Sequence, residues 1–252
     1  MTTGDPLWEA PHYMNLPGAQ IVRTESILRA HDILGDVIRA RGMACVHGGA
    51  GLGKTLSVTA GLHELAPQAT TRIQFRSRPY PTDIRKKLFA DLKLQGDQPA
   101  TPLEYDELLK YELRAPFRVL VCDEAQQLSR ECFEYWRHLW DDTNTDISVV
   151  FVGGGDCHRV LSREPMLESR IYAWQKFNPM QLEEVLEVIP AFHPLWGDAD
   201  PEDIAFANQS AAHGNFRAWA KITRHCQDGL DHLGRDRIDR KLLEWVFSRI
   251  AH

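Results

Sequence analysis

The spacing of hydrophobic residues predicts alternating helices and strands up to about residue 178. Apolar side chains recur at helical spacing from Glu25 to Arg41, which predicts an amphipathic helix. Mainly apolar segments at 43–46, 118–122 and 147–152 are typical of strands buried on both faces of a parallel sheet. The same reading predicts strands at 72–75 and 171–177, and helices at 54–65, 81–94, 103–113 and 129–141.

The pattern changes after Asn178-Pro179, where strand signals stop and helical spacing continues. Strand–helix alternation followed by a helical run indicates an α/β domain and a small all-helical domain. We therefore expect an irregular N-terminal arm at 1–20, an α/β domain at 21–178 and a helical domain at 179–252. Within the last of these, helices are predicted at 181–189, 201–211, 215–226 and 239–251.

Composition limits the class of protein. The chain has 252 residues, 43% hydrophobic residues and a net charge of -6, so a surface coated in positive charge is excluded but a local basic patch is not. No apolar run approaches the ~20 residues of a membrane span, and the N-terminus lacks the order of a secretory signal. The five scattered cysteines indicate reduced, buried thiols rather than a zinc site. We expect a cytoplasmic protein with no membrane partner.

The segment HGGAGLGKT, at 47–55, lies between a predicted strand and a predicted helix. In that context successive backbone N–H groups and the helix N-terminus cradle phosphates. Lys54 is expected to reach the β- and γ-phosphates, and the Thr55 hydroxyl to bind Mg²⁺. The alternative is a glycine-rich turn with a chance lysine. The predicted nucleotide-binding residues are Gly48, Gly49, Ala50, Gly51, Leu52, Gly53, Lys54, Thr55 and Leu56.

Two carboxylates, Asp123 and Glu124, directly follow the predicted strand that ends at Cys122. Ligands of open α/β sheets bind at the carboxyl ends of strands. We expect Asp123 to hold Mg²⁺ through water and Glu124 to polarise the attacking water. The alternative is an acidic turn before the next helix. A water-activating glutamate does not suit a metabolite kinase, and the sequence has no Asn-Lys-x-Asp guanine-binding motif, so ATP hydrolysis is the predicted activity.

With these two motifs the chain resembles the AAA+ ATPases over about residues 20–225. It is most similar to transposition regulators of the MuB, TnsC and TniB type and to their relative ExeA. The resemblance implies an α/β, P-loop AAA+ three-layer domain with a central parallel sheet, followed by a small all-helical lid. It also implies ATP and Mg²⁺ as cofactors and self-association into a ring or helical filament. The stretches that carry it are GGAGLGKT at 48–55, RVLVCDEAQQL at 118–128, VVFVGGGD at 149–156, LESRI at 167–171 and GNFR at 214–217.

The resemblance assigns a role to an arginine before the last predicted strand. Arg170 corresponds to the arginine finger that reaches a neighbouring subunit's nucleotide and makes hydrolysis depend on assembly. Arg163 and Arg159 are rivals for this role. The alternative for each is an ion pair with a nearby glutamate, Glu164 or Glu168.

Other nucleotide contacts are implied by the resemblance alone. Arg217 corresponds to a second sensor that projects from the lid, and its alternative is a surface arginine. Val22 and Thr24 lie where such proteins close over adenine. A polar sensor of the γ-phosphate is expected after the strand at 147–152, but this chain has Gly153-Gly154-Gly155 there. Asp156 or a backbone N–H is the candidate substitute, and a flexible turn is the alternative.

The segment 72–87, RIQFRSRPYPTDIRKK, has six basic residues and one acidic residue. A few lysines and arginines on one face suffice to contact DNA phosphates without reading sequence. The resemblance places this segment on the DNA-facing inside of a filament, whereas the alternative is a solvated helix face. The three consecutive basic residues cannot share one helix face. The predicted DNA contacts are Arg76, Arg78, Arg85, Lys86 and Lys87.

These observations predict an ATP-dependent, DNA-binding AAA+ regulator. It would oligomerise on double-stranded DNA and recruit or activate a transposase or similar recombinase, with hydrolysis driving disassembly. Lys54, Glu124, Arg170 and Arg217 are its predicted catalytic residues. The alternatives are an ExeA-like secretion ATPase, although no membrane-linked segment is recognised here, a helicase loader, and an ATP-gated scaffold with little hydrolysis.

Overall fold

The computed structural model describes residues 16–75 and 78–250, which divide into two compact units. One unit comprises Arg29–Ala50 and Lys54–Phe177, and contains the sheet. The other comprises residues 16–28, Gly51–Gly53 and 178–250, and is helical. The arm expected at 1–20 therefore lies outside the described residues as far as residue 15.

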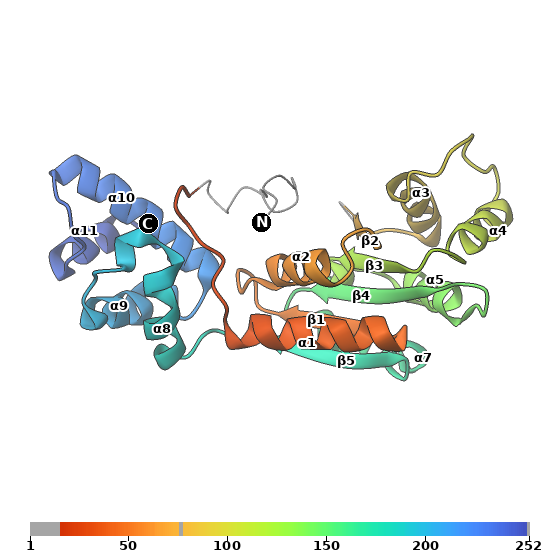
Figure 1. The fold of residues 1–252 in the computed structure, drawn as a ribbon, viewed down its shortest axis with the longest axis horizontal. Helices are drawn as coiled ribbons and strands as arrows, with labels where there is room; N and C mark the ends of the chain where they lie inside the picture. Colours follow the sequence, from red (N-terminus) through yellow and green to blue (C-terminus); the bar gives the residue numbers. More distant parts are fainter. Residues whose placement is uncertain (1–15, 76–77, 251–252) are drawn as a thin grey trace. The chain divides into compact units, whose positions relative to one another are not determined.

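A five-stranded parallel sheet forms the centre of the α/β unit, with the strand order β2-β3-β4-β1-β5 (Figure 1). The α/β prediction with a central parallel sheet is thus confirmed. Because the strands are parallel, their carboxyl ends lie along the same edge of the sheet. The strands are β1 Met43–Gly48, β2 Thr70–Gln74, β3 Arg118–Asp123, β4 Ile147–Gly153 and β5 Ile171–Phe177.

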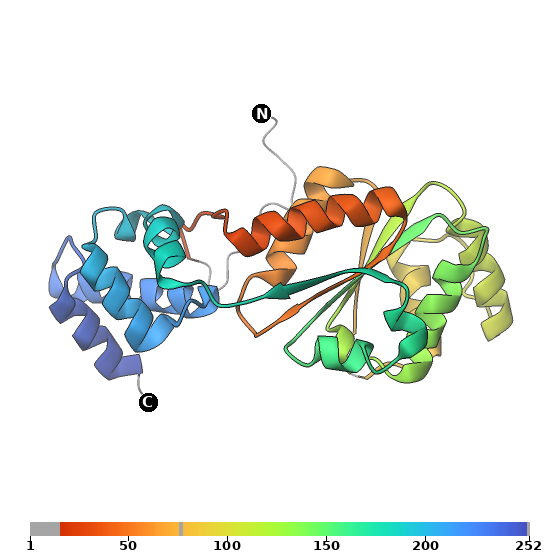
Figure 2. The same cartoon turned by 90° about the horizontal axis from the view of Figure 1, so that it is seen from below.

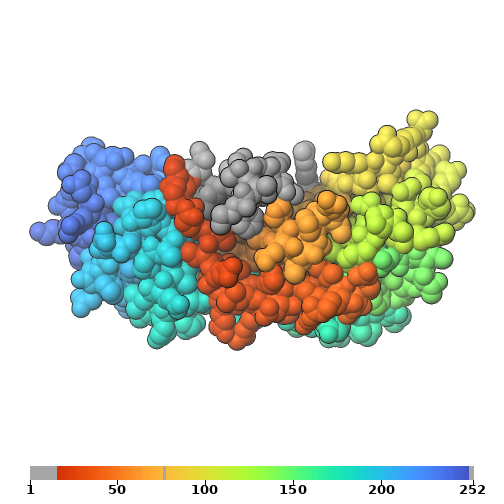
Figure 3. Space-filling view, viewed as in Figure 1, coloured from red at the N-terminus to blue at the C-terminus, as the bar shows by residue number. Residues whose placement is uncertain are grey.

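Helices cover both faces of this sheet, which gives three layers. In Figure 2, α1 (red) and α2 (orange) lie on one face, and α5, α6 and α7 (green) lie on the other. Helices α1 and α2 are side by side in Figure 3, and a Cβ at Gly61 of α2 would come 3.0 Å from the Leu34 side chain of α1. The helices of this unit are α1 Glu25–Ala40, α2 Lys54–Leu65, α3 Pro81–Asp91, α4 Pro102–Glu112, α5 Arg130–Asp141, α6 Cys157–Leu161 and α7 Pro165–Glu168.

The predicted buried strands are buried along their length. All residues of β1 and β4 are buried, as the continuous apolar runs require. Phe133 and Trp136 of α5 pack edge-on against Phe151 of β4, with ring centroids 6.0 and 6.2 Å apart. This aromatic cluster explains why α5 has its large apolar residues on a single face.

The helical unit has an apolar core of its own. Trp196 and Trp219 meet edge to face at 5.1 Å, and the Trp196 indole N–H donates to the Thr223 hydroxyl at 2.8 Å. Leu16 and Val22 are buried in the same core. The elements are α8 Leu182–Phe192, a 3₁₀ turn η2 Pro194–Trp196, α9 Pro201–Ala207, a π-helical turn η3 Asn208–Ala212, α10 Phe216–Leu233 and α11 Arg240–Ile250.

The main departures from the predicted elements have local causes. Helix α10 continues to Leu233, past the predicted end at 226, and stops where Gly234 adopts a left-handed conformation. Helices α6 and α7, which sequence analysis missed, have five and four residues. Such short helices show too little periodicity to be recognised.

All five cysteines are buried and none forms a disulfide, as predicted for structural thiols. Burial is the only cause that raises the pKa of Cys226, to about 12. Within the described residues, no helix is both long and apolar enough to cross a membrane.

Candidate nucleotide-binding site

The glycine-rich loop connects β1 to α2, in the predicted strand–loop–helix context. Strand β1 ends at Gly48 and α2 begins at Lys54. Gly48 has φ +149°, and a Cβ there would come 2.4 Å from the carbonyl oxygen of Phe177 in β5. Only glycine permits this close approach. The Lys54 ammonium donates to the Gly49 carbonyl at 2.7 Å.

The tip of the loop, Gly51–Gly53, is part of the helical unit. Within that unit the backbone N–H of Arg217 donates to the Gly51 carbonyl at 3.1 Å. Asn215 is the N-cap of α10, and its side-chain oxygen accepts from the N–H groups of Arg217 and Ala218 at 3.0 and 3.2 Å. The GNFR stretch therefore places Arg217 in the first turn of α10, with an exposed side chain.

The two residues expected near adenine also have defined positions in the helical unit. Val22 is buried in the apolar core of that unit. Thr24 is buried, and its hydroxyl accepts from the Ile27 N–H at 3.2 Å, so that it caps the start of α1. Both side chains thus have packing or capping contacts in the structure.

Asp123 ends β3 and is nearly inaccessible to solvent, with 5% of its side chain exposed. Its Oδ2 lies 3.4 Å from the Thr55 hydroxyl, and its Oδ1 accepts the Glu124 N–H at 2.9 Å. The fold thereby brings together the two predicted metal-binding residues. Hydroxyl and carboxylate oxygens are ligands that suit Mg²⁺, so this donor set fits the ion.

Arg72 is a further residue of the site, which sequence reasoning assigned only to a basic segment. Its guanidinium pairs with Oδ2 of Asp123. The register explains this pair, because Gln74 of β2 lies opposite Asp123, and Arg72 is two residues earlier on the same face. The charge of Asp123 is thus balanced by an arginine on the neighbouring strand.

Glu124 has an unusual backbone conformation. Its φ of 56° and ψ of 37° are left-handed, which costs a non-glycine residue about 1 kcal/mol or more and is found at functional sites. A 3₁₀ turn, η1 Ala125–Gln127, follows. The side-chain amide of Gln126 donates to the Glu124 carboxylate at 2.5 Å and accepts from the Gly154 N–H at 2.9 Å.

The three glycines after β4 have different environments. A Cβ at Gly153 would come 2.5 Å from both Cys157 Sγ and Gln126 Oε1, whereas at Gly155 nothing lies within 4 Å. Asp156, one candidate substitute for the sensor, is exposed and pairs with Arg159 at 3.0 Å. The other candidate, a backbone N–H, is engaged by Gln126 at Gly154.

The three candidate trans-acting arginines differ in their contacts. Arg170 donates to Asp141 at 2.6 Å and to the Met166 carbonyl at 2.7 Å, so it pairs with an aspartate of α5 rather than with Glu164 or Glu168. Burial favours the neutral Asp141 carboxyl, but hydrogen bonds from Arg170 and Arg137 outweigh it and lower that pKa. Arg159 pairs with Asp156.

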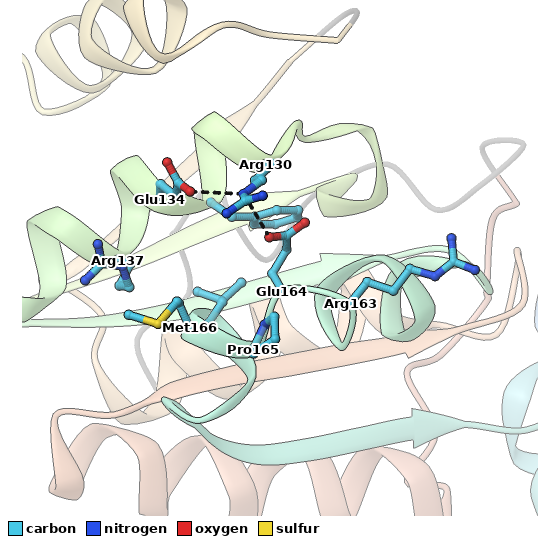
Figure 4. A pocket seen from close by; sticks show the side chains of 9 residues that line it. Arg130, Glu134, Arg137, Arg163, Glu164, Pro165 and Met166 are labelled. Atoms are coloured by element: carbon cyan, nitrogen blue, oxygen red, sulfur yellow. Dashed lines mark hydrogen bonds and ion pairs between the residues drawn. The ribbon is translucent and has the colours of Figure 1, made fainter.

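Arg163 lies beside a pocket of about 130 Å³ between α5 and α7. Figure 4 shows its side chain directed away from the other labelled residues, while Arg130 contacts Glu134 and Glu164 at 3.1 and 3.6 Å. Among the described residues, no carboxylate lies within ion-pair distance of Arg163, which is exposed.

The basic segment is only partly available to a ligand. Arg85 forms a two-pronged ion pair with Asp106 at 2.8 and 2.9 Å, lies over the Tyr135 ring and is 13% exposed. Lys87 pairs with Asp91 at 2.8 Å. The predicted contact at residue 76 lies outside the described residues, and Arg78 and Lys86 are exposed.

His47, immediately before the loop, is buried and lies near basic side chains. Burial lowers the pKa of His47 to about 4, and repulsion from His158, Lys176 and Lys54 adds to the shift. The His47 ring therefore stays neutral near pH 7, immediately before the glycine-rich loop.

The chain has a parallel sheet of this order, with a glycine-rich loop after β1 and an acid pair after β3, and this fold matches that of P-loop AAA+ domains. Residues 38–161 match the family model of an AAA domain. The chain is also 25% identical over 148 residues to a potential ATP-binding protein of Staphylococcus aureus. That match covers 56% of this chain and 51% of the relative, so the chain spans about half the length of the curated relative it matches.

Solved structures share this fold at low sequence identity. The Aeropyrum pernix ORC2 protein, in ADPNP–ADP complexes, is 14% identical, with a TM-score of 0.70, over 98% of this chain and 72% of that one. Cdc6p of Pyrobaculum aerophilum is 19% identical, with a TM-score of 0.70, over 93% of this chain and 68% of that one. The RuvB Holliday junction branch migration motor of Thermotoga maritima is 14% identical, with a TM-score of 0.64, over 93% of this chain and 72% of that one.

Proposed function

We propose that this protein is a cytoplasmic AAA+ ATPase that binds Mg²⁺-ATP and hydrolyses it to ADP and phosphate. The observation that carries the proposal is the meeting of Thr55, Asp123 and Glu124 at one edge of the sheet, directly after the glycine-rich loop. The loop amides and Lys54 would hold the phosphates. Thr55 and Asp123 would hold Mg²⁺, which would neutralise charge on the phosphates.

Glu124 is the proposed base that orients and deprotonates the attacking water. Arg217 and the segment 179–252 are the proposed sensor and lid, and Arg170 is the proposed finger for a neighbouring subunit. The segment 21–178 is the proposed nucleotide-binding domain, with an arm at 1–20.

The Glu124→Gln variant tests the hydrolysis step. It keeps the size of the side chain but removes the base, so we expect ATP turnover to fall by about a hundredfold or more, with ATP binding retained. Lys54→Ala should instead lose ATP binding. Steady-state phosphate release and binding of a fluorescent ATP analogue measure the two effects, and unchanged turnover in Glu124→Gln would refute the assigned base.

At a finer level, we propose that ATP drives assembly of the protein on double-stranded DNA and that the assembly recruits a transposase or similar recombinase. Two observations support DNA binding. Arg78 and Lys86 are exposed in the basic segment, and the structural relatives include Drosophila ORC bound to DNA, which is 18% identical with a TM-score of 0.67. These relatives support DNA association in general rather than one recombinase.

Electron microscopy with duplex DNA and a non-hydrolysable ATP analogue tests assembly. Rings or filaments are the expected result, and a monomer that stays off DNA at low salt would refute the proposal. The lack of a polar side chain at Gly153-Gly154-Gly155 favours one second candidate, an ATP-gated scaffold with little hydrolysis. ATP-dependent assembly with negligible turnover of the unmodified protein would favour that alternative.

A further inference from the structure

The Gln126 side chain connects the two strands that border the proposed reaction centre. It belongs to the 3₁₀ turn after β3, yet its amide contacts the residue that follows β4. Nε2 donates to Glu124 Oε2 at 2.5 Å, and Oε1 accepts the Gly154 N–H at 2.9 Å. Both ends of the amide are therefore engaged, which fixes the orientation of its plane.

The glycines after β4 make room for this amide. Gly153 is buried, and any side chain there would place its Cβ 2.5 Å from Gln126 Oε1. At Gly154 the nearest atom to a Cβ would be Gln126 Nε2 at 3.5 Å, an ordinary van der Waals distance. The space beside the end of β4 is thus filled by a side chain that comes from the end of β3.

Gln126 is the hydrogen-bond partner of the Glu124 carboxylate among the described residues. The left-handed conformation of Glu124 turns the chain sharply, and its carboxylate is only partly buried. A side chain in this setting samples several rotamers unless a hydrogen bond selects one. Gln126 is positioned to make that selection, since a donor at 2.5 Å is a short, charge-assisted contact.

We propose that Gln126 is a positioning residue for ATP hydrolysis: it holds the Glu124 carboxylate in the orientation that activates water, and links it to the end of β4. This inference rests on the proposed function. Gln126 acts through Glu124 and carries no proton itself. A displacement of the carboxylate by about 1 Å would cost up to about a hundredfold in rate.

The chain supplies a matched control in the next residue. Gln127 has the same side chain in the same 3₁₀ turn, and its side chain makes no hydrogen bond among the described residues. Its backbone N–H bonds to the Glu124 carbonyl, which an alanine substitution leaves in place. Gln127→Ala therefore controls for any general loosening of the turn.

Three variants of the full chain test the proposal through steady-state ATPase rates and ATP affinity. Gln126→Ala removes both contacts. Gln126→Glu keeps the size and the acceptor for Gly154, but replaces the donor to Glu124 with a second carboxylate. We expect kcat to fall about ten- to a hundredfold in both, while the dissociation constant for ATP changes less than about threefold, and Gln127→Ala to behave as the unmodified protein.

A double variant separates positioning from an independent effect. If Gln126 works only through Glu124, Gln126→Ala will slow the Glu124→Gln protein no further. Further slowing would overturn the proposal, as would a wild-type or raised kcat in Gln126→Ala. A normal kcat in Gln126→Glu would also overturn it, because size alone would then suffice. If the unmodified protein itself does not hydrolyse ATP, the proposed function fails instead.

Discussion

The Arg72 guanidinium pairs with the same Asp123 oxygen, Oδ2, that lies 3.4 Å from the Thr55 hydroxyl. Asp123 and Thr55 are the proposed Mg²⁺-binding residues, so a bound metal ion would compete with Arg72 for the Asp123 carboxylate. Arg72 has 44% of its side chain exposed and can leave the site without breaking the core.

This competition predicts that Arg72→Gln strengthens Mg²⁺ binding. Removal of the competing cation should lower the Mg²⁺ concentration for half-maximal ATP binding by about two- to fivefold, the range expected for a partly exposed ion pair. Titration of a fluorescent ATP analogue with Mg²⁺ measures the shift. Arg78→Gln, which alters charge at an exposed position of the same segment, is the control. A higher Mg²⁺ requirement in Arg72→Gln would show that Arg72 contacts the nucleotide instead.

The glycines after β4 should differ sharply in their tolerance of a methyl group. Gly153→Ala places a Cβ 2.5 Å from Cys157 Sγ and Gln126 Oε1, whereas Gly155→Ala meets nothing within 4 Å. We expect Gly153→Ala to lower the free energy of unfolding by about 1–3 kcal/mol, and Gly155→Ala to change it by less than about 0.5 kcal/mol. Urea denaturation measures both values, and equal tolerance would contradict the close packing at Gly153.

Two measurements distinguish the candidate trans-acting arginines: the free energy of unfolding of each variant, and the ATPase activity of mixtures of variants. Arg170→Ala breaks the ion pair with Asp141, whose side chain is 27% exposed, and should cost about 1 kcal/mol of unfolding free energy. Arg163→Ala should cost less than about 0.5 kcal/mol.

Mixing with Glu124→Gln protein then identifies the residue that acts on a neighbour. A subunit without its finger retains an intact nucleotide site, and a Glu124→Gln neighbour supplies the arginine. We expect the mixture with Arg170→Ala to recover ATPase activity that neither protein has alone. Recovery only with Arg163→Ala would move the role to Arg163.

His47 should make stability depend on pH. Burial and positive neighbours lower its pKa to about 4, below the usual 6.5 of the unfolded chain. Between these values the unfolded state binds more protons than the folded state, so stability falls as pH falls from about 6.5 towards 4. His47→Gln should remove about 1–2 kcal/mol of the difference in unfolding free energy between pH 8 and pH 5. Urea denaturation at the two pH values checks this, and an unchanged difference would contradict it.

DNA binding should depend on the exposed basic residues of the segment. Arg85 should not contact DNA phosphates, because it already pairs with Asp106. Loss of two phosphate contacts in Arg78→Ala/Lys86→Ala should reduce the slope of log affinity against log salt by about 2. Arg237→Ala/Lys241→Ala, at two exposed positions of the helical unit, is the charge-matched control. Fluorescence anisotropy with labelled duplex DNA at several salt concentrations gives the slopes, and equal slopes in both variants would contradict the assigned surface.

The order of the elements was predictable because local patterns determine it. Continuous apolar runs identify strands with two buried faces. The order of strand, glycine-rich loop and lysine predicts a phosphate-binding turn without reference to the rest of the chain. The sequence therefore determined the α/β class, the P-loop and the acid pair after β3. The boundaries of long helices were also close, except where Gly234 rather than residue 226 ends α10.

Only the tertiary structure decided which polar side chains pair with residues far away in the sequence. Arg72 contacts Asp123 only because β2 pairs with β3 in one particular register. Arg85 is mostly buried because it forms an ion pair with Asp106 of the neighbouring helix α4. Gln126 reaches Gly154 because strands β3 and β4 are adjacent. These contacts join residues up to 51 positions apart, and no local pattern reports such pairings, since they depend on which strands and helices become neighbours in the folded chain.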